Sequence, residues 1–506
     1  MRQLILGIFT LSFATTFGQY NGLEMFDESF VHEIRINFEQ EDYWDSLEYY
    51  FEQHLELGAE KKYMVASVEI DGNVIDSVGV REKGFYSNYG SDGLKEPLKI
   101  DFNVYVPGTK YDGLKKLNLQ NGFRDPTMMR DALSYKFMRD AGIAAPRSSY
   151  ARVYLNDIYW GLYIVVEQID DRFLKNWFEN NDGDLFKCIS NTTMEWEGTA
   201  AISYQDDFEL KTNEELNNWD DFVHLIDKIN TADEFDDSIS TALQMNNYLR
   251  VLAADVLMFN WDSHYDNGRN FFVYYDSTAS AFQWIPWDYN LGFSNYGTGI
   301  VLNYDGGVSS PKPLVINVME SEIYRAQYFN HLCILIENYF NLENLEPYID
   351  ETKLLITDAL EEDPNKYFNM GEFNANIDLN ISSVNDLGFE EVVPGLKLFI
   401  KERYATVISQ LEPYAHNCTA LGIAEGDQIE ASHVVYPNPS NTGLFNVVFG
   451  DAVQEISVYS MTGQIIYSQT VTGQTQTEID LSAFGNGVYI VELLGETREL
   501  KRVVIQ

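Results

Sequence analysis

Alternating apolar and polar positions dominate the first third of the chain. The stretches "SVEIDG" (67–72), "SVGVRE" (77–82) and "PLKIDF" (97–102) alternate in this way and are separated by Gly, Asn and Ser residues. A period of two residues is typical of half-buried β-strands. Two more strands are predicted in "SYARVYLNDIYWGLYIVVEQID" (149–170), where an Asn-Asp turn joins them. The front of the chain is therefore predicted to be rich in strands.

Helical spacing takes over further along the chain. In "TMMRDALSYKFMRDAG" (127–142), Met129, Leu133 and Phe137 recur at helical intervals, and the stretch ends at a glycine. Beyond Gly183, we expect helices at 241–259, 322–340, 350–361 and 394–412. These patterns predict an α+β fold in which a strand-rich lobe is followed by a helix-rich lobe.

The end of the chain has a different character. Residues 416–432 include the small, acidic stretch "CTALGIAEGDQIEAS" and are predicted to be a linker. From residue 433 to 506, short strand patterns recur about every ten residues with Gly turns between them. Regular strand spacing of this kind indicates a small all-β sandwich. The main domain is then expected to cover residues 28–415.

The N-terminal stretch "MRQLILGIFTLSFATTFGQ" has the layout of a signal peptide over residues 1–18. Arg2 precedes an apolar run that is too short to span a bilayer. No later stretch approaches 18 unbroken apolar residues, so we expect an exported mature chain without a transmembrane segment. The three cysteines, Cys188, Cys333 and Cys418, lack metal-type spacing. They could form one disulfide, but the sequence does not select the pair.

Composition adds a constraint on partners. Apolar residues make up 45% of the chain and aromatic residues 14%, which indicates a globular protein with a substantial core. The 78 acidic and 34 basic residues give a formal charge of -44. This charge repels nucleic acids and anionic lipids, so a charged partner should be a basic protein or a metal ion. The same acidity also serves solubility.

Candidate chemistry is concentrated in "NWDSHYDNGRNFFVYYD" (260–276) and "QWIPWDYNLGF" (283–293). Asp288 is flanked by apolar residues, so its charge needs a cation or several hydrogen-bond donors, unless it is a turn-forming Asp bonded to backbone amides. Asp262 lies where an apolar helical stretch meets a polar loop, which is a rigid mount for a catalytic group. Asn267 and Asn270 follow it. A base, an amide oxygen and a second carboxylate suit metal-assisted phosphoryl transfer, and the same oxygens would suit Ca²⁺.

Longer motifs carry a family resemblance. From about residue 28 to 415 the chain resembles the CotH kinase family, which comprises secreted or spore-coat proteins related to protein kinases. The resemblance rests on "VGVREKG", "PLKIDFN", "YDGLKKLNLQNGFRDPTMMRDALSY", "GIAAPRSSYARVYLNDIYWGLYIVVEQID", "GDLFK", "NWDSHYDNGRNFFVYY" and "IPWDYNLGF". It implies a two-lobed, protein-kinase-like fold that binds ATP together with Mg²⁺ or Mn²⁺, with Ca²⁺ as an alternative.

The resemblance also implies roles for individual residues. Asp262 corresponds to the catalytic aspartate that accepts the proton of the substrate hydroxyl. Asp288 corresponds to the metal-binding aspartate. Asn270 resembles the metal-binding asparagine, and Asn267 is its rival because it has the five-residue spacing of ordinary protein kinases. Independently of the resemblance, Asp266 lies in the more polar part of the loop, and a solvated loop carboxylate is expected to contribute little.

Two residues expected to contact the nucleotide complete the predicted site. Lys99 matches the family's phosphate-binding strand lysine, and its side chain should point away from those of Leu98 and Ile100. Its ordinary interpretation is a solvated lysine on a half-buried strand. Glu167 ends a strand where the nucleotide base would lie, although a paired glutamate at a strand end is common.

Two departures from the family pattern leave the function open. Lys83-Gly84 is followed by "FYSNYGSDG" in place of the usual Asn-Ser-Ser, and Asn290 replaces a common acidic residue. The predicted function is an exported kinase that transfers the γ-phosphate of ATP to Ser or Thr hydroxyls of a protein substrate. The alternative is a weakly active or inactive kinase-like protein that acts in surface binding or adhesion.

About the last 75 residues resemble the type A sorting domain of the type IX secretion system, through "YPNPSNTGLFNV", "VYSMTGQII", "GVYIVEL" and "KRVVIQ". This resemblance implies export through the periplasm, with the type IX secretion machinery as a partner. The product should be secreted or held at the outer cell surface.

Overall fold

The chain divides into two compact units, residues 1–421 and 422–506. The computed structural model describes residues 21–84, 95–178, 180–231, 235–294, 299–302, 312–384, 390–414 and most of 434–505. The signal peptide and the linker predicted at 1–18 and 416–432 lie outside the described residues. Both helices and strands build the first unit, so the predicted α+β content is confirmed.

The front of the first unit is a closed barrel with the strand order β1-β2-β3-β4-β5-β7-β6. Its strands are β1 (His32–Asn37), β2 (Met64–Ile70), β3 (Asn73–Glu82), β4 (Leu98–Asp101), β5 (Lys116–Gln120), β6 (Ser148–Leu155) and β7 (Ile158–Glu167). Strand β1 pairs parallel with β6, and the other neighbours are antiparallel. Alternate residues such as Ile34, Val68, Ile100 and Leu117 are fully buried, which explains the period of two in the sequence.

One helix interrupts the region that was expected to be mostly strands. Helix α1 (Tyr43–Leu57) connects β1 and β2, and it ends at Gly58 in the left-handed conformation. Leu47 and Phe51 are buried one turn apart on this helix. Their four-residue spacing is the helical signal in a segment that also carries exposed or partly buried apolar residues.

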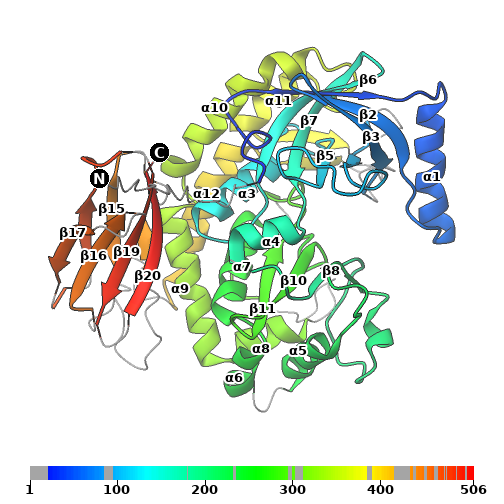
Figure 1. Cartoon of the computed structure of the whole chain (residues 1–506). Coiled ribbons are helices and arrows are strands. Elements are labelled where there is room, and N and C mark those ends of the chain that lie inside the picture. Colours follow the sequence, from blue (N-terminus) through cyan, green and yellow to red (C-terminus); the bar gives the residue numbers. More distant parts are fainter. Residues whose placement is uncertain are drawn as a thin grey trace, which may run out of the picture. The chain divides into compact units, whose positions relative to one another are not determined.

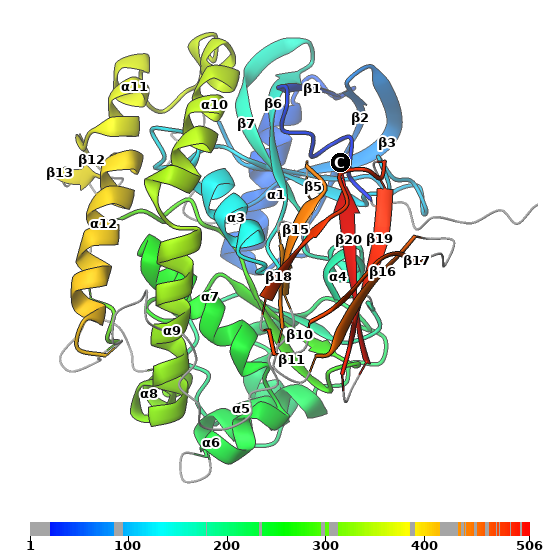
Figure 2. The same ribbon diagram turned by 90° about the vertical axis from the view of Figure 1, so that its left-hand side faces the viewer.

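A second sheet has the order β11-β10-β8-β9. Its strands are β8 (Leu185–Cys188), β9 (Phe208–Leu210), β10 (Phe271–Asp276) and β11 (Ala281–Pro286). In the views of Figures 1 and 2 the barrel strands lie above this sheet, with α3 (Arg130–Asp140) and α4 (Asp171–Phe178) between them. A small two-stranded sheet pairs β12 (Ile381–Val384) with β13 (Glu390–Val393).

The remaining helices of the first unit pack into the larger of its two hydrophobic cores. They are α5 (Asp220–Asn230), α6 (Phe235–Ser238), α7 (Met245–Met258), α8 (Pro313–Glu320), α9 (Glu322–Asn338), α10 (Leu342–Glu361), α11 (Met370–Asp378) and α12 (Leu396–Leu411). The helices predicted at 241–259, 322–340 and 394–412 are confirmed within a few residues. Helix α10 begins eight residues before the predicted start, because Pro347 lies inside it and Pro ordinarily ends a helix pattern.

The second unit consists of two sheets around one hydrophobic core. Its strands are β14 (Val434–Tyr436), β15 (Leu444–Val448), β16 (Glu455–Ser460), β17 (Ile465–Thr470), β18 (Gln476–Asp480), β19 (Gly487–Leu494) and β20 (Arg498–Ile505). The sheets have the orders β14-β15-β18 and β17-β16-β19-β20. Phe445 and Ile479 from one sheet and Val458 and Val491 from the other are fully buried in the shared core.

Cysteine usage is partly resolved by the structure. Cys188 is a buried free thiol, and Cys333 is disulfide-bonded. Cys418 lies outside the described residues. In the part of the chain that the structure describes, no helix combines the length and the apolar character needed to cross a membrane.

Candidate functional site

The loop that carries Asp262 starts from a rigid helix end. Helix α7 ends at Met258, and Phe259 adopts a left-handed φ of 46° that turns the chain out of the helix. Arg403, on α12, donates hydrogen bonds to the carbonyl oxygens of Val256 (2.6 Å) and Leu257 (3.2 Å). These bonds satisfy carbonyls that the end of a helix leaves open. The loop is thereby anchored to a second helix.

The structure brings Asp262, Asn267 and Asn270 together. The side-chain amide of Asn270 donates to Oδ2 of Asp262 (2.8 Å), and that of Asn267 donates to Oδ1. In turn, Oδ1 of Asn267 accepts a hydrogen bond from Asn191 (2.8 Å). Burial raises the pKa of Asp262 to about 6, although the hydrogen bond from Asn267 lowers it. Asp262 is therefore ionised at neutral pH but is a stronger base than an exposed aspartate.

Asp288 lies beside this loop. The backbone N–H of Trp287 donates to the carbonyl oxygen of Asn270 (3.1 Å), which joins the two segments. Asp288 has a left-handed φ of 62°, and its own N–H donates to the hydroxyl of Tyr135 (2.9 Å). Among the described residues, no donor forms a hydrogen bond with its carboxylate. The sequence also allowed a turn-forming Asp288 whose carboxylate is bonded to backbone amides. The described contacts contain no such bond.

A second carboxyl group, Asp131, lies in the same place and was not predicted. It belongs to the first turn of α3, is buried, and accepts a hydrogen bond from the N–H of Tyr289 (2.8 Å). Burial and the neighbouring charge of Asp288 raise the pKa of Asp131 to about 8, whereas Lys83 acts to lower it. The helix thus holds a carboxyl group and a tyrosine hydroxyl against the Asp288–Tyr289 segment.

The side-chain oxygens around Asp288 could hold a divalent cation only together with ligands that the described residues do not supply. Among the described residues, no three His, Cys, Asp or Glu side chains are grouped closely enough to form a metal site. Hard cations also accept amide oxygens. Oδ1 of Asn267 is engaged by Asn191, whereas Oδ1 of Asn270 accepts no hydrogen bond in the described part of the chain. Asp288 and Asn270 therefore offer open oxygens, and further ligands would come from water or a bound phosphate.

Lys99 points out of the barrel, as predicted. It pairs across the sheet with Arg81 on β3 and with Asn118 on β5, so these three side chains share one face. Its ammonium donates a hydrogen bond to the side-chain oxygen of Gln168. Burial lowers the pKa of Lys99 well below its usual value, and the charges of Arg81 and Lys187 lower it further.

Two further lysines lie near Lys99 and were not assigned from the sequence. Lys83 donates a hydrogen bond to Oε1 of Gln120 (2.7 Å), and its ammonium lies 5.8 Å from the Trp287 ring. Lys187, on β8, lies 5.9 Å from the ring of Phe272, and the Phe272 and Trp287 rings are 5.9 Å apart. Burial lowers the pKa of Lys83 to about 8 and that of Lys187 to about 8.

The charges in this region are unbalanced. Within the described residues, Arg81, Lys83, Lys99 and Lys187 form no ion pair with a carboxylate, although the chain has 78 acidic residues to supply one. All four are half-buried; Asp288 and Asp131 attract Lys83, and Glu209 attracts Lys187. Half-buried cations without a directly paired carboxylate are costly, so an arrangement of four is characteristic of an anion-binding site. Beside them lies the open carboxylate of Asp288. The arrangement can accommodate a polyanion together with a divalent cation.

Other candidate residues lie elsewhere or have other partners. The Glu167 carboxylate binds Arg147 through Nη2 (2.5 Å) and Nε (3.0 Å), and the next residue, Gln168, is the one that reaches Lys99. Burial raises the pKa of Asp266, and the charge of Lys312 acts to lower it. The two amides that hold the Asp262 carboxylate are those of Asn267 and Asn270, so Asp266 has a different electrostatic environment.

His264 belongs to the core and not to the polar loop. It is buried and packs edge-on against the rings of Phe271 and Trp284, which are stacked on each other. Burial lowers the pKa of His264 to about 3, so the imidazole is neutral at physiological pH. Gly268, also in this loop, has φ +77°, and a Cβ there would lie 2.2 Å from the carbonyl oxygen of Thr192. Only glycine fits that position.

Comparison with known proteins identifies the family. Residues 81–407 match the family described as "CotH kinase protein", and residues 434–506 match the "Secretion system C-terminal sorting domain". The chain therefore belongs to the CotH kinase protein family and carries a C-terminal sorting domain of the type IX secretion system. That domain directs the protein to the secretion machinery and out of the cell, as a secreted or surface-attached product.

Individual relatives cover different shares of the chain. The inner spore coat protein H of Bacillus subtilis is 26% identical over 272 residues, which are 51% of this chain and 71% of that protein. Beta-agarase A of Zobellia galactanivorans is 30% identical over 87 residues, which are 17% of this chain and 16% of the agarase.

Two solved structures also match. The Helicobacter pylori proinflammatory kinase CtkA is 14% identical with a TM-score of 0.22, over 52% of this chain and 92% of CtkA. PorZ, a surface component of the type IX secretion system of Porphyromonas gingivalis, is 18% identical with a TM-score of 0.14, over 16% of this chain and 13% of PorZ.

Proposed function

We propose that the first unit is a metal-dependent protein kinase that transfers the γ-phosphate of ATP to a Ser or Thr hydroxyl of a protein substrate. Its fold would be the two-lobed, kinase-like one, with the barrel and the second sheet on opposite sides of the nucleotide. The observation that carries this proposal is the group of four cations without carboxylate partners among the described residues, beside Asp262 and Asp288. Membership of the CotH kinase protein family supports it.

The acid–base chemistry falls to Asp262. Its two carboxylate oxygens are held by Asn267 and Asn270, and it stands on an anchored helix end, so its orientation is fixed. With its pKa raised to about 6, it can accept the proton of an attacking hydroxyl at neutral pH. The hydroxyl oxygen then bonds to the γ-phosphorus while the bond to the leaving ADP breaks.

The cations would bind and orient the triphosphate. Lys83, Lys99 and Lys187 lie on three different strands or strand ends, so they can reach several phosphate oxygens at once. Asp288 and the side-chain oxygen of Asn270 would hold Mg²⁺ or Mn²⁺, and Ca²⁺ suits the same oxygens. A bound metal ion would neutralise charge on the phosphates. Asn270 is preferred to Asn267 because the oxygen of Asn267 is already occupied by Asn191.

The base of the nucleotide would lie near the end of β7. Glu167 was expected there, but its carboxylate is bound to Arg147. We therefore assign the contact on this side to Gln168, which already bonds Lys99 and Asn118. The protein substrate remains defined only by its hydroxyl group and by compatibility with the acidic chain, which favours a basic acceptor.

Binding of ATP tests this proposal before any transfer is measured. Isothermal titration with ATP and Mg²⁺ should show binding that Lys99→Ala weakens by about tenfold or more, because a buried charge partner of the phosphates is lost. Asp288→Asn should weaken binding mainly in the presence of Mg²⁺. Lys397→Ala is the matched control, since Lys397 is paired with Glu346 at 2.8 Å and with Asp350 at 2.7 Å. If the folded parent binds no nucleotide with either metal, the kinase proposal is wrong and surface binding or adhesion takes its place.

A further inference from the structure

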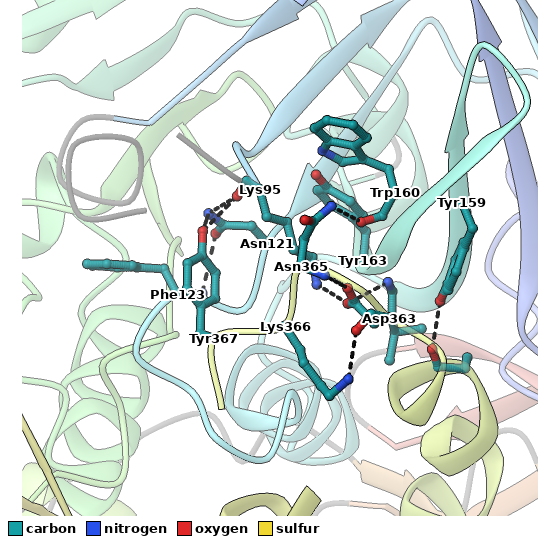
Figure 3. A network of polar contacts seen from close by, with 12 residues as sticks. Lys95, Asn121, Phe123, Tyr159, Trp160, Tyr163, Asp363, Asn365, Lys366 and Tyr367 are labelled. Carbon is teal, nitrogen blue, oxygen red and sulfur yellow. Dashed lines mark hydrogen bonds and ion pairs between the residues drawn. The ribbon is translucent and has the colours of Figure 1, made fainter. Parts of the chain in front are cut away.

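An ion pair with both side chains fully buried joins two distant parts of the first unit. Nζ of Lys95 lies 2.6 Å from Oδ2 of Asp363, and both side chains are 0% exposed. Lys95 precedes β4, whereas Asp363 follows α10. Figure 3 shows the two groups facing each other, with the backbone around Asp363 close to them. The Asp363 carboxylate also accepts the N–H groups of Leu162 (2.9 Å) and Asn365 (2.7 Å).

A buried ion pair is by itself weak evidence of a gain in stability. Removing two charges from water is costly, and apolar pairs of similar volume are often equally stable. Its distinctive effect is on the main chain. The carbonyl oxygen of Lys95 accepts hydrogen bonds from Nδ2 of Asn121 (2.8 Å) and from the hydroxyl of Tyr367 (2.7 Å), and Asn121 also donates to Tyr367 (2.9 Å). These contacts form the closed group in Figure 3.

The same two segments hold Lys83 at both ends. The N–H of Lys83 donates to the carbonyl oxygen of Pro97 (2.9 Å), two residues after Lys95. Its ammonium donates to Oε1 of Gln120 (2.7 Å), the residue before Asn121. The network therefore fixes the separation of the two groups that determine where the Lys83 ammonium lies. Lys83 in turn lies over Trp287, next to Asp288.

We infer that Lys95 and Asp363 are positioning residues for Lys83, and that they set the affinity for the phosphates of ATP without contacting them. The path runs from Asp363 to Lys95, and from the Lys95 segment to Lys83 through Pro97 and through Asn121 and Gln120. This inference rests on the proposed function, because it gives Lys83 the role of a phosphate-binding group.

A double-mutant cycle tests the path, with MgATP as the probe. The variant Lys95→Met/Asp363→Asn removes both charges. It keeps one acceptor oxygen, which serves one of the two N–H groups, because Leu162 bonds Oδ2 of Asp363 and Asn365 bonds Oδ1. It should raise the Kd for MgATP about three- to tenfold, within the range of coupling between residues in one network. Lys83→Met should raise the Kd at least as much. Combining all three changes should give the same Kd as Lys83→Met alone.

Two tyrosines provide a milder, matched comparison that removes one oxygen atom each. Tyr367→Phe removes the hydroxyl that bonds Lys95, whereas Tyr159→Phe removes one that bonds the carbonyl oxygen of Ala359 on α10 (2.7 Å). Tyr367→Phe should raise the Kd about twofold or more. Tyr159→Phe should leave it unchanged, because its bond does not reach Lys95. These variants keep the test usable if the charge-removing variant folds poorly.

Additive effects would overturn the inference. If Lys95→Met/Asp363→Asn weakens MgATP binding by the same factor in the parent and in the Lys83→Met background, the pair acts through general stability. A second outcome is that the parent binds MgATP and Lys83→Met weakens this binding, whereas neither Lys95→Met/Asp363→Asn nor Tyr367→Phe changes it. In that case only the positioning role is wrong. If the folded parent does not bind MgATP, both the proposed function and this inference fail.

Discussion

Replacing Lys187 should make the nucleotide-free protein more stable, which is the reverse of what most buried substitutions do. Lys187 is half-buried, and its ammonium forms no ion pair with a carboxylate among the described residues. The charges of Lys61 and Lys83 repel it, whereas Glu209, opposite it on β9, attracts it. Burial lowers its pKa from 10.5 to about 8. A difference of one in pKa corresponds to about 1.4 kcal/mol, so the charged ammonium destabilises the folded state by about 3 kcal/mol at pH 7. Lys187→Met should recover about 1 to 3 kcal/mol of this.

The pH dependence of this gain has a defined sign. Between pH 8 and 10.5 the unfolded chain still holds the Lys187 proton while the folded chain has released it. The folded state is therefore stabilised as the pH rises through this window, and this stability is lost as the pH falls to about 8. The difference between Lys187→Met and the parent should be largest below pH 8 and should disappear above about pH 10.5.

Tryptophan fluorescence during urea unfolding provides the assay. All eight tryptophans lie before residue 422, so the signal reports on the first unit alone. Lys397→Met is the control, because Lys397 is paired with Glu346 and Asp350 and should give no gain. MgATP should stabilise the parent more than Lys187→Met, since binding stabilises a fold by mass action. A destabilised Lys187→Met that keeps the full response to MgATP would refute the reasoning that this cation exists for an anionic ligand.

Other expected outcomes concern the base, a buried carboxyl group and export. The kcat/KM for phosphoryl transfer should fall as the pH drops through about 6, where Asp262 becomes protonated, and a pH–rate profile without this limb would exclude Asp262 as the base. Burial raises the pKa of Asp255 to about 7, so the parent carries a buried charge at pH 8.5 and is mostly neutral there at pH 6. The gain in the free energy of unfolding from Asp255→Asn, measured by fluorescence, should therefore be larger at pH 8.5 than at pH 6; equal gains would contradict this. Deleting residues from about 430 onward should leave the first unit folded but prevent delivery out of the cell. Cell fractionation and immunoblotting would show where the truncated chain accumulates. Its normal delivery to the surface would count against the sorting role.

Much of the fold follows from local patterns. Strands β2 and β4 and helices α9 and α12 were predictable because one face of each is buried, which imposes a period of two or 3.6 residues on the sequence. Helix α7 is buried on nearly all sides, and its apolar run predicted it. Helix α1 was missed because its two buried residues, Leu47 and Phe51, lie among residues that are polar, exposed or only partly buried. The early part of α10 was hidden by Pro347.

The site was only partly predictable because its members come from separate elements. The sequence neighbours Asp262, Asn267 and Asn270 do come together, and Asp288 joins them through the bond between Trp287 and Asn270. Lys83 and Lys187 stand in the quoted motifs "VREKG" and "GDLFK", and a lysine next to a buried strand was the signal available for them.

Two other features were harder to predict. Asp131 stands in the quoted motif "TMMRDALSY", but its pattern is that of an ordinary acidic residue near a helix start, which does not separate it from a solvated one. The link between Lys95 and Asp363 spans 268 residues, and tertiary folding alone creates it.

Transfer of labelled phosphate tests the central claim most directly. The parent protein, incubated with γ-labelled ATP and Mg²⁺ or Mn²⁺, should label itself or an added basic protein. Asp262→Asn should reduce this about a hundredfold or more while MgATP still stabilises the fold, because only the base is lost. Asp266→Asn should cost less than about tenfold. Label transferred equally well by Asp262→Asn, or no transfer by a parent that binds MgATP, would contradict the assignment of this site as a kinase centre.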